Sequence, residues 1–545
     1  MGRQPRRDLV AGLTVAVVAL PLALGFGVSS GLGAQAGLAT AVVAGALAAV
    51  FGGSHLQVSG PTGAMTVVLV PIAAAHGAGG VLTVGLIAGL LLVVLAVARA
   101  GRAMRYVPAS VVEGFTLGIA CVIGLQQLPN ALGVPVGDGE RVLVIAWDAV
   151  RDFAVTPNWT AIGVAVAVAA VMLAGARWRP TVPFSIVAVI AATLVVTVFG
   201  WDSVALIGPL PAGLPTPSLA FLDPAAVAGL LPSAVAVAAL AALESLLSAS
   251  VADGMTVGQH HDPDRELFGQ GLANIAAPLF GGVPATGAIA RTAVNVRTGA
   301  GSRLAALTHA ALLAVIVYAA APLVGRIPLA ALAGVLLATA IRMIEVGSLA
   351  AMARATRSDA AVLALTATAT VVLDLVYAVI LGLLAAGALA LRAVARQARL
   401  DRVDLADDLP AATSDEEHAL LAQHIVAYRI DGPLIFAAHR FLLELPDITD
   451  LSALVLRMSR VTTIDASGAL VLKDTVDKLE QRGITVYVSG IRDGHHQPLE
   501  ALGVITRLHD AGRVFATTPE AIAAARHHLV ERGVLPSPET PVVDR

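Results

Sequence analysis

Stretches of about twenty apolar residues recur along the first 400 positions of this 545-residue chain, and they decide what it can fold into. A helix of that length crosses the hydrocarbon core of a bilayer, where no water can satisfy the backbone polar groups. Only 13% of the residues are charged and the mean hydropathy is +0.82. A soluble protein of this size needs more charge to cover its surface. The chain is therefore predicted to be an all-α polytopic membrane protein.

Fourteen windows are predicted to cross the membrane as helices. With the N-terminus inside, arginines cluster in the gaps that should face the cytoplasm, and the long gap at 200–225 has no Lys or Arg. This bias places both termini in the cytoplasm and favours a multi-pass protein of the cytoplasmic (inner) membrane. The predicted spans are 9–27, 34–51, 61–76, 80–98, 107–129, 159–175, 182–199, 226–252, 266–280, 285–296, 304–322, 328–344, 359–373 and 375–395.

The composition changes near residue 401, where charged residues become frequent. Two domains are predicted: a transmembrane domain at 1–400 and a cytoplasmic domain at 415–532. In the second domain, HIVAYRI, LSALVLRM and ITVYVSG have the β-branched and aliphatic content of strands, whereas 466–482 and 518–531 have the pattern of helices. The C-terminal domain is thus expected to be an α/β fold.

One glycine-rich phrase occurs twice, as FGGSHLQVSGPTGAM at 51–65 and FGGVPATGAIARTAV at 280–294. The two copies lie at the starts of the third and tenth spans, which are short and seven spans apart. The body is therefore predicted to be a 7+7 inverted repeat, in which the two helix starts point at each other near the midplane. Converging helix N-termini suit an anion. The alternative is a pair of ordinary Gly/Pro loops between packed helices.

The eighth span, AVAVAALAALESLLSASVADGM, carries Glu244 near its middle and Ser248 one turn further on the same face. An ionisable group at this depth costs about 3 kcal/mol on insertion scales unless it is paired or hydrated. Such a group suits a cycle in which a proton is gained and lost during transport. The alternative is a glutamate with a structural hydrogen bond.

Other polar residues of the body are interpreted as structural. The cluster of Asp253, His260, His261 and Asp262 is assigned to a solvated loop, and no metal site is predicted. Four further polar residues are interpreted as hydrogen-bonding partners between helices: Gln126, Gln127, Asn274 and His309.

The phrases GLTVAVVALPLALGFGVSSG and SGPTGAMTVV, the whole stretch at 240–300 and a C-terminal DASG together resemble the SulP anion transporters, the bacterial branch of solute carrier family 26. The resemblance covers essentially the whole chain. It implies fourteen spans in a core and a gate domain, followed by a cytoplasmic STAS domain (sulfate transporter and anti-sigma factor antagonist). It also implies a small-anion substrate (sulfate, bicarbonate, chloride or a dicarboxylate) and a homodimer.

Carried onto this sequence, the resemblance puts the anion between the starts of the third and tenth spans. Arg291 stands where related transporters place an anion-facing arginine; the alternative is an arginine that snorkels or caps a helix. Leu22 follows Pro21 where many sulfate-type members have Gln, which favours the bicarbonate and dicarboxylate branches. The predicted substrate-binding residues are Gly63, Ala64, Met65, Thr66, Ala288, Ile289, Ala290 and Arg291.

The resemblance also bears on the coupling ion. Members with Glu at the position of Glu244 look proton-coupled, and members with Asp look sodium-coupled, so H⁺ is expected at Glu244 and Ser248, with Na⁺ as the alternative. In the STAS domain, Asp465 is predicted to cap a helix. Ser467 matches the serine that is phosphorylated in the anti-sigma antagonists, and it is a candidate for phosphorylation.

These observations predict secondary active transport of a small anion, by proton symport. The alternatives are a sodium-coupled bicarbonate transporter, a passive anion channel or exchanger, and a membrane-tethered signalling protein. No P-loop, catalytic triad or metal-ligand spacing is present, so no enzyme is expected. The expected partners are the anion, the lipid bilayer and a regulatory partner of the STAS domain, with no nucleic acid and no cofactor beyond the coupling ion.

Overall fold

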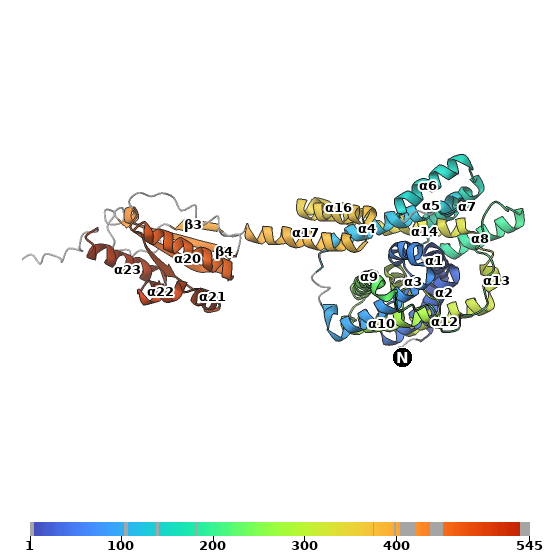
Figure 1. The fold of residues 1–545 in the computed structure, drawn as a ribbon, viewed down its shortest axis with the longest axis horizontal. Coiled ribbons are helices and arrows are strands. Elements are labelled where there is room, and N and C mark those ends of the chain that lie inside the picture. Colours follow the sequence, from blue (N-terminus) through green and yellow to red (C-terminus); the bar gives the residue numbers. More distant parts are fainter. Residues whose placement is uncertain are drawn as a thin grey trace, which may run out of the picture. The chain divides into compact units, whose positions relative to one another are not determined.

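The computed structural model describes residues 5–102, 107–137, 141–179, 182–373, 375–396, 399–403, 421–435 and 451–534. The chain divides into two compact units, Met1–Ala386 and Gly387–Arg545. The first unit is helical and the second contains a sheet with helices packed on it (Figure 1). The expected fold class, a polytopic helical body with a C-terminal α/β domain, is confirmed.

Each predicted span contains helix, and further short helices lie between the spans. Among the described residues, eight helical stretches are long and apolar enough to cross a membrane, and two shorter apolar helices accompany them. The count of fourteen crossings stays a prediction. The helices of the body are α1 (Pro5–Ser29), α2 (Ala34–Phe51), α3 (Gly63–Val97), α4 (Ala109–Gln126), α5 (Leu128–Leu132), α6 (Val142–Val155), α7 (Trp159–Trp178), α8 (Phe184–Phe199), α9 (Val227–Gly254), α10 (Pro263–Leu279), α11 (Ile289–Arg297), α12 (Leu304–Ala319), α13 (Ala321–Val324), α14 (Leu329–Met343), α15 (Val346–Ala355), α16 (Arg357–Val372) and α17 (Leu375–Ala395).

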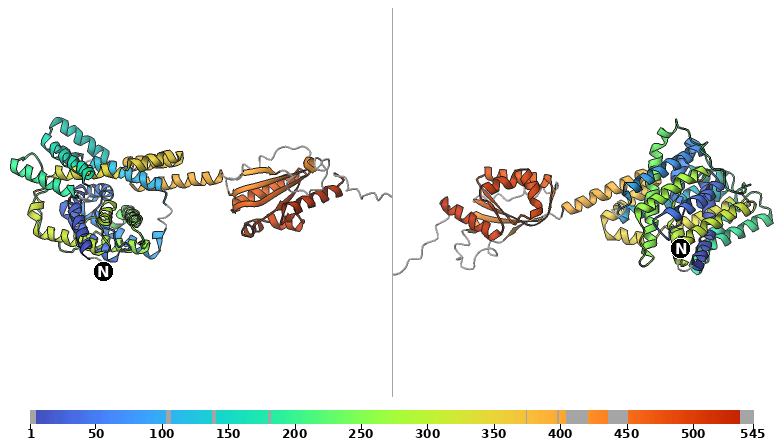
Figure 2. Two further views of the ribbon diagram at one scale, coloured as in Figure 1. Left: turned by 180° about the vertical axis from the view of Figure 1, so that it is seen from behind. Right: turned by 90° about the horizontal axis from the view of Figure 1, so that it is seen from below.

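The body has two groups of helices, which Figures 1 and 2 show from three directions. In one group, α10 packs against α2 and α3, α9 packs against α3 and α11, and α12 packs against α1 and α2. In the other, α4 packs against α16, and α14 packs against α4 and α7. This division matches the core and gate that the resemblance implies.

Small residues let these helices approach closely. A Cβ added at Gly37 of α2 would lie 1.9 Å from the carbonyl oxygen of Ala23 on α1, and one at Gly89 of α3 would lie 2.6 Å from the backbone nitrogen of Ile275 on α10. Helices in lipid associate through such packing, because lipid tails are as apolar as the side chains. The alanine- and glycine-rich composition therefore allows close helix packing in the first of these two groups.

The third and fourth predicted spans belong to one long element, α3. Its helix is interrupted at Gly77, where the backbone has φ 65° and ψ −169°. A positive φ is accessible to glycine without a Cβ clash. The break lies in the gap that the sequence places between residues 76 and 80, so the boundary between the two spans was predicted correctly.

Two short strands that the sequence does not predict lie inside the body. β1 (Ser59–Gly60) pairs antiparallel with β2 (Thr286–Gly287), so that Ser59 lies opposite Gly287. The tenth span was expected to be helical from residue 285, but α11 begins at Ile289. Backbone groups at membrane depth need partners within the protein. The paired strands supply those partners where Pro61 and Pro284 prevent regular helix.

The C-terminal unit has a five-stranded sheet in the order β3-β4-β5-β6-β7, with β3 antiparallel to β4 and the other pairs parallel. The three strands predicted from sequence are β4, β5 and β6, and the two predicted helices are α20 and α23. β3 lies upstream of residue 415, where the sequence places the domain start. The elements are β3 (Arg399–Val403), β4 (Ile425–Leu434), β5 (Ala453–Ile464), α20 (Ala466–Gln481), β6 (Thr485–Ser489), η4 (Asp493–His495), α21 (His496–Ala501), α22 (Val504–Asp510), β7 (Val514–Phe515) and α23 (Thr518–Glu531).

Side chains alternate across this sheet, as its strand pattern requires. Leu454 and Leu456 of β5 pack with α20 and α22, whereas Ala453 and Val455 pack with α23 on the other face. Both faces of the parallel strands are thereby covered.

Candidate anion site at two opposed helix starts

The antiparallel pair of strands brings two helix starts together. β1 leads into α3 at Gly63, and β2 leads into α11 at Ile289. Because the strands run in opposite directions, the two helices leave the pair in opposite directions, with their N-termini inside the body. The residues predicted to bind substrate form the first turn of α3 and the N-cap and first turn of α11: Gly63, Ala64, Met65, Thr66, Ala288, Ile289, Ala290 and Arg291. All are buried except Ile289, which is half-buried, and Ala290, which is exposed.

The start of α3 is capped by Thr62. Its hydroxyl oxygen accepts a hydrogen bond from the Met65 N–H at 3.4 Å, and its O–H donates to Glu244 Oε2 at 2.9 Å. An N-cap of this kind satisfies one of the amide groups that a helix start leaves without an intrahelical partner. The cap therefore joins the α3 start to the carboxylate of α9.

The start of α11 has no side-chain cap. Its N-cap residue is Ala288, whose methyl group cannot accept a hydrogen bond, although its own N–H donates to the Val58 carbonyl at 2.9 Å. The first amides of a helix have no intrahelical partner. At α11 they stay available at the positive end of the helix dipole, which favours negative charge.

Arg291 lies in the first turn of α11 and is 1% exposed. Its Nη2 donates to the carbonyl oxygen of Pro61, across the strand pair, whereas its Nη1 is buried and has no hydrogen-bond partner among the described residues. A Cβ at Gly60 would lie 2.6 Å from that Nη1, so Gly60 makes room for the guanidinium. A buried cation with a free donor is costly unless something negative pairs with it.

Glu244 of α9 is half-buried, and the Arg291 charge acts on it. Ser248 lies one turn away, as predicted, but its hydroxyl hydrogen-bonds the Thr292 hydroxyl of α11 at 3.0 Å. The two residues predicted to share one ion thus have different partners: Glu244 reaches the α3 start and Ser248 reaches α11. One turn of α9 separates them along its axis.

The sequence prediction omitted several polar residues around the strands. Thr62 stands in the repeated Thr-Gly-Ala phrase, and that repetition was the available signal. Gln57 is buried with neither amide atom hydrogen-bonded among the described residues, and a Cβ at Gly287 would lie 1.8 Å from its Nε2. Gln270 donates to Ser59 Oγ at 2.6 Å. The bond from Gln270 to Ser59 holds β1 in place, and no local pattern in the sequence predicts it.

Of the residues interpreted as bonding between helices, Asn274 bonds instead within its own helix and to the segment before β2. Its amide donates to the Gln270 and Ala285 carbonyls at 2.8 Å, and its Oδ1 accepts from the Ala285 N–H at 2.8 Å. Gln127 donates to Ser29 Oγ at 2.9 Å. His309 is fully buried and neither ring nitrogen has a hydrogen-bond partner among the described residues, so that interpretation is wrong for His309.

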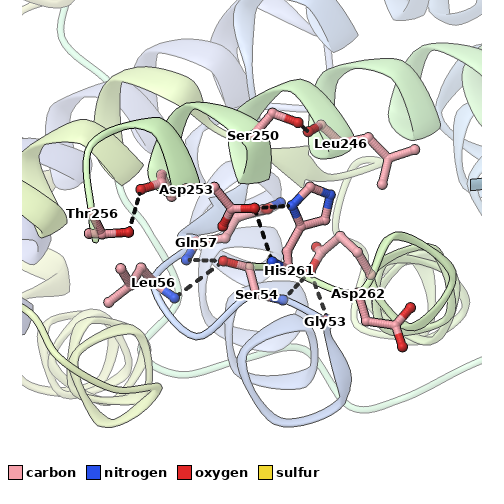
Figure 3. A network of polar contacts seen from close by, with 12 residues as sticks. Gly53, Ser54, Leu56, Gln57, Leu246, Ser250, Asp253, Thr256, His261 and Asp262 are labelled. Atoms are coloured by element: carbon pink, nitrogen blue, oxygen red, sulfur yellow. Dashed lines mark hydrogen bonds and ion pairs between the residues drawn. The ribbon is translucent and has the colours of Figure 1, made fainter. Parts of the chain in front are cut away.

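The histidine and aspartate cluster after α9 forms a local network (Figure 3). Asp253 Oδ2 lies 2.7 Å from His261 Nδ1 and accepts from the His261 N–H at 3.0 Å. Asp262 caps α10 by accepting from the Asp264 and Arg265 amides. Among the described residues, no group of three or more His, Cys, Asp or Glu side chains could hold a metal ion. The network closes the turn between α9 and α10.

In the C-terminal unit, Asp465 caps α20, because its Oδ1 accepts from the Gly468 N–H at 2.7 Å. The capping prediction is confirmed. Ser467 follows in the first turn of that helix and is exposed. Its phosphorylation stays a prediction, and a phosphate there would lie at a positive helix end.

Comparisons with known proteins agree with this architecture. Residues 6–366 match the sulfate permease family and residues 419–521 match the STAS domain. "Putative sulfate transporter YvdB" of Bacillus subtilis (strain 168) is 35% identical over 521 residues, covering 93% of this chain and 95% of that protein. The bicarbonate transporter BicA of Synechocystis sp. is 31% identical over 406 residues, covering 73% of this chain and 71% of that protein.

Two solved structures also resemble this chain. The transmembrane domain of a cyanobacterial BicA has a TM-score of 0.65 at 31% identity, covering 70% of this chain and 98% of that one. SLC26A9 has a TM-score of 0.78 at 16% identity, covering 96% of this chain and 91% of that one, which shows a shared fold.

A multi-pass helical body with two opposed helix starts, joined to a STAS domain, is the architecture of a family of membrane transport proteins. The chain belongs to the sulfate permease family, the SulP group of anion transporters.

Proposed function

We propose that the chain binds a small anion between the starts of α3 and α11 and carries it across the cytoplasmic membrane together with a proton. The observation that supports this most directly is Arg291, a buried guanidinium at an uncapped helix start with one Nη atom unpartnered among the described residues. An anion at this position would receive charge from Arg291 and hydrogen bonds from the first amides of α11.

In this proposal, Glu244 couples anion transport to the movement of a proton. Its carboxylate lies close enough to the site for its charge to interact with that of Arg291. While it is ionised, its negative charge offsets the field of Arg291 and repels an incoming anion, and these effects are strong because little water screens them. A proton on Glu244 removes the repulsion and frees the field of Arg291 for the anion. Anion and proton then bind together, which is the requirement for symport.

The substrate class follows from the relatives. One is named as a sulfate transporter and another as a bicarbonate transporter. We propose sulfate, bicarbonate or a dicarboxylate as the substrate, and Leu22 after Pro21 favours the last two. We further propose that both termini are cytoplasmic, that the protein acts as a homodimer, and that the STAS domain binds a regulatory partner.

The test is uptake into proteoliposomes. Purified protein is given labelled sulfate, bicarbonate or succinate under an inward proton gradient or an inward sodium gradient. We expect one of these anions to accumulate with the proton gradient alone. Glu244→Gln keeps the shape of the side chain but cannot ionise, so it should still bind the anion and lose proton-driven accumulation.

Glu113→Gln is the matched control, because Glu113 lies on α4 and its Oε1 accepts from Ser348 Oγ at 2.8 Å, away from both helix starts. It should keep proton-driven accumulation. Full accumulation by Glu244→Gln would rule out the assignment of the proton, and accumulation that follows sodium at fixed pH would support sodium coupling instead.

A further inference from the structure

One hydroxyl group connects the carboxylate of α9 to the helix start of α3. Thr62 Oγ1 carries a single hydrogen, which it donates to Glu244 Oε2, while its lone pairs accept from the Met65 N–H. Thr62 is 5% exposed, so little water is available to replace either partner. The state of this hydroxyl therefore depends on the state of Glu244.

An ionised Glu244 can only accept hydrogen bonds, so the Thr62 O–H points at it. A protonated Glu244 has a hydrogen of its own, and it can donate that hydrogen to the second lone pair of Thr62 Oγ1. The bond between the two side chains then reverses its direction. The Thr62 hydrogen is released and can turn toward the space in front of the α3 start.

We propose that Thr62 is a positioning residue for coupling: a proton on Glu244 reverses the Thr62–Glu244 hydrogen bond and turns the Thr62 hydroxyl into a donor for the anion. This inference rests on the proposed function, which it deepens by naming how the proton is communicated to α3. The same event removes a negative charge and adds a hydrogen-bond donor, so both changes favour anion binding.

The other ionisable groups on α9 and on the elements packed against it do not take the role of Glu244 in this switch. α9 packs against α3, α10, α11 and β2. On α11, Arg291 acts on Glu244. On α10, Glu266 accepts from the Gly53 and Ser54 amides, and Asp264 pairs with Arg102. The other ionisable side chains on these elements are His76 on α3, Asp253 on α9 itself, Arg265 on α10 and Arg297 on α11.

The experiment compares Thr62→Val with Thr62→Ser. Valine has the shape of threonine without the hydroxyl, and serine retains the hydroxyl. The measurement is the KM for uptake of the anion that the wild type accumulates (labelled sulfate, bicarbonate or succinate), at external pH 6 and pH 8. We expect the wild type and Thr62→Ser to bind about tenfold more tightly at the lower pH. We expect Thr62→Val to show a smaller change of about threefold, because the charge on Glu244 is still removed at low pH but no hydroxyl is left to turn toward the anion.

Loss of the α3 cap could also weaken the fold, by about 1 kcal/mol. Thr62→Asn separates the two roles, because its Oδ1 can accept from Met65 while its amide nitrogen remains a fixed donor to Glu244. It should fold like the wild type and show the reduced pH dependence of Thr62→Val. Thr83→Val is the control for a lost hydroxyl on the same helix, since Thr83 donates to the Gly79 carbonyl at 2.8 Å.

The outcomes separate this inference from the proposed function. Wild-type pH dependence in Thr62→Val or in Thr62→Asn would overturn the role of Thr62 while leaving proton symport intact. A wild type whose uptake does not depend on pH would overturn both. A similarly reduced response in Thr83→Val would show that any lost hydroxyl on α3 has the same effect, and it would also overturn the role of Thr62.

Discussion

The starts of α3 and α11 occupy equivalent places in the body but differ in their side chains. α3 begins with a threonine cap that is bonded to a carboxylate, and α11 begins with an uncapped alanine followed by a buried arginine. Each start follows a short strand, and the strands pair with each other. The scaffold is therefore nearly symmetric, whereas the chemistry placed on it is not.

In the proposed symport mechanism, this difference separates two tasks that a symporter must combine. The uncapped start has free amides and a cation, which suit binding of an anion. The capped start has its hydroxyl committed to Glu244, which suits communication with a proton. Under that proposal, a repeated fold supplies two converging dipoles, and single residues decide which helix start binds the anion and which one couples to the proton.

The largest expected effect comes from the arginine. Arg291→Ala removes the buried cation and leaves only the dipole ends, which contribute about 0.3–2 kcal/mol each. Losing one partner of a buried charge pair costs about 2–5 kcal/mol. We therefore expect anion affinity to fall by about 100-fold or more, measured by equilibrium binding of the labelled anion in detergent. If the two helix starts differ as described, the Arg291 charge contributes more to anion affinity than the helix dipoles do.

Arg297→Ala is the control, because Arg297 lies in the last turn of the same helix and is exposed. It should leave affinity unchanged. An Arg291→Ala protein that binds within about threefold of the wild type would show that the helix ends alone hold the anion.

A smaller effect is expected when α11 is given the cap that it lacks. Ala288→Ser places a hydroxyl where it can accept from the Arg291 amide, which makes the α11 start resemble the α3 start. Such a cap stabilises a helix by about 0.5–2 kcal/mol. We expect unchanged or higher thermal stability together with an anion affinity that is weaker by about five- to tenfold, because a donor is now occupied.

Ala293→Ser, further along α11, is the matched control and should change neither quantity much. Tighter anion binding by Ala288→Ser would mean that the hydroxyl itself contacts the anion, and that the contrast between capped and uncapped starts does not govern affinity.

Much of the body could be predicted from the sequence, because membrane helices are announced by local runs of apolar residues. The break at Gly77 and the helix starts near Gly63 and Ile289 were also accessible, since glycine and proline mark them locally. β1 and β2 were not. Each strand has two residues, and each exists because a partner more than 220 residues away pairs with it.

The repeated Thr-Gly phrase also led to a wrong predicted start for the second helix. Thr62-Gly63 begins α3, but the matching Thr286-Gly287 is strand β2, and α11 begins two residues later. The prediction of Glu244 depended on residue type and depth, which the sequence contains, and that of Arg291 depended on the resemblance to the SulP transporters. The bond from Thr62 to Glu244 and the separate bond from Ser248 to Thr292 depend on how α9 is rotated against its neighbours. That rotation is set by packing, so no local pattern could supply it.

The smallest effect concerns the loop before β1, which has an ionisable group that the segment before β2 lacks. His55 is exposed, and its Nδ1 accepts from Arg303 Nε at 3.1 Å. Partial desolvation, with the Arg303 and Arg265 charges, lowers the pKa of His55 below its usual 6.5. The folded protein therefore binds this proton less well than the unfolded chain does. Stability should be unaffected well above pH 6.5 and should fall as the pH drops through that value, because the unfolded state then takes up more protons.

His55→Gln removes this contribution while it keeps a polar side chain beside Arg303. We expect the thermal midpoint of the wild type to fall between pH 8 and pH 5.5 by about one degree more than that of His55→Gln, a small difference because the side chain is exposed. His527→Gln, an exposed histidine of α23 in the C-terminal unit, is the control and should behave like the wild type. If His55→Gln lost as much stability in acid as the wild type, the loop before β1 would carry no pH response. The asymmetry between the two halves would then be confined to the helix starts themselves.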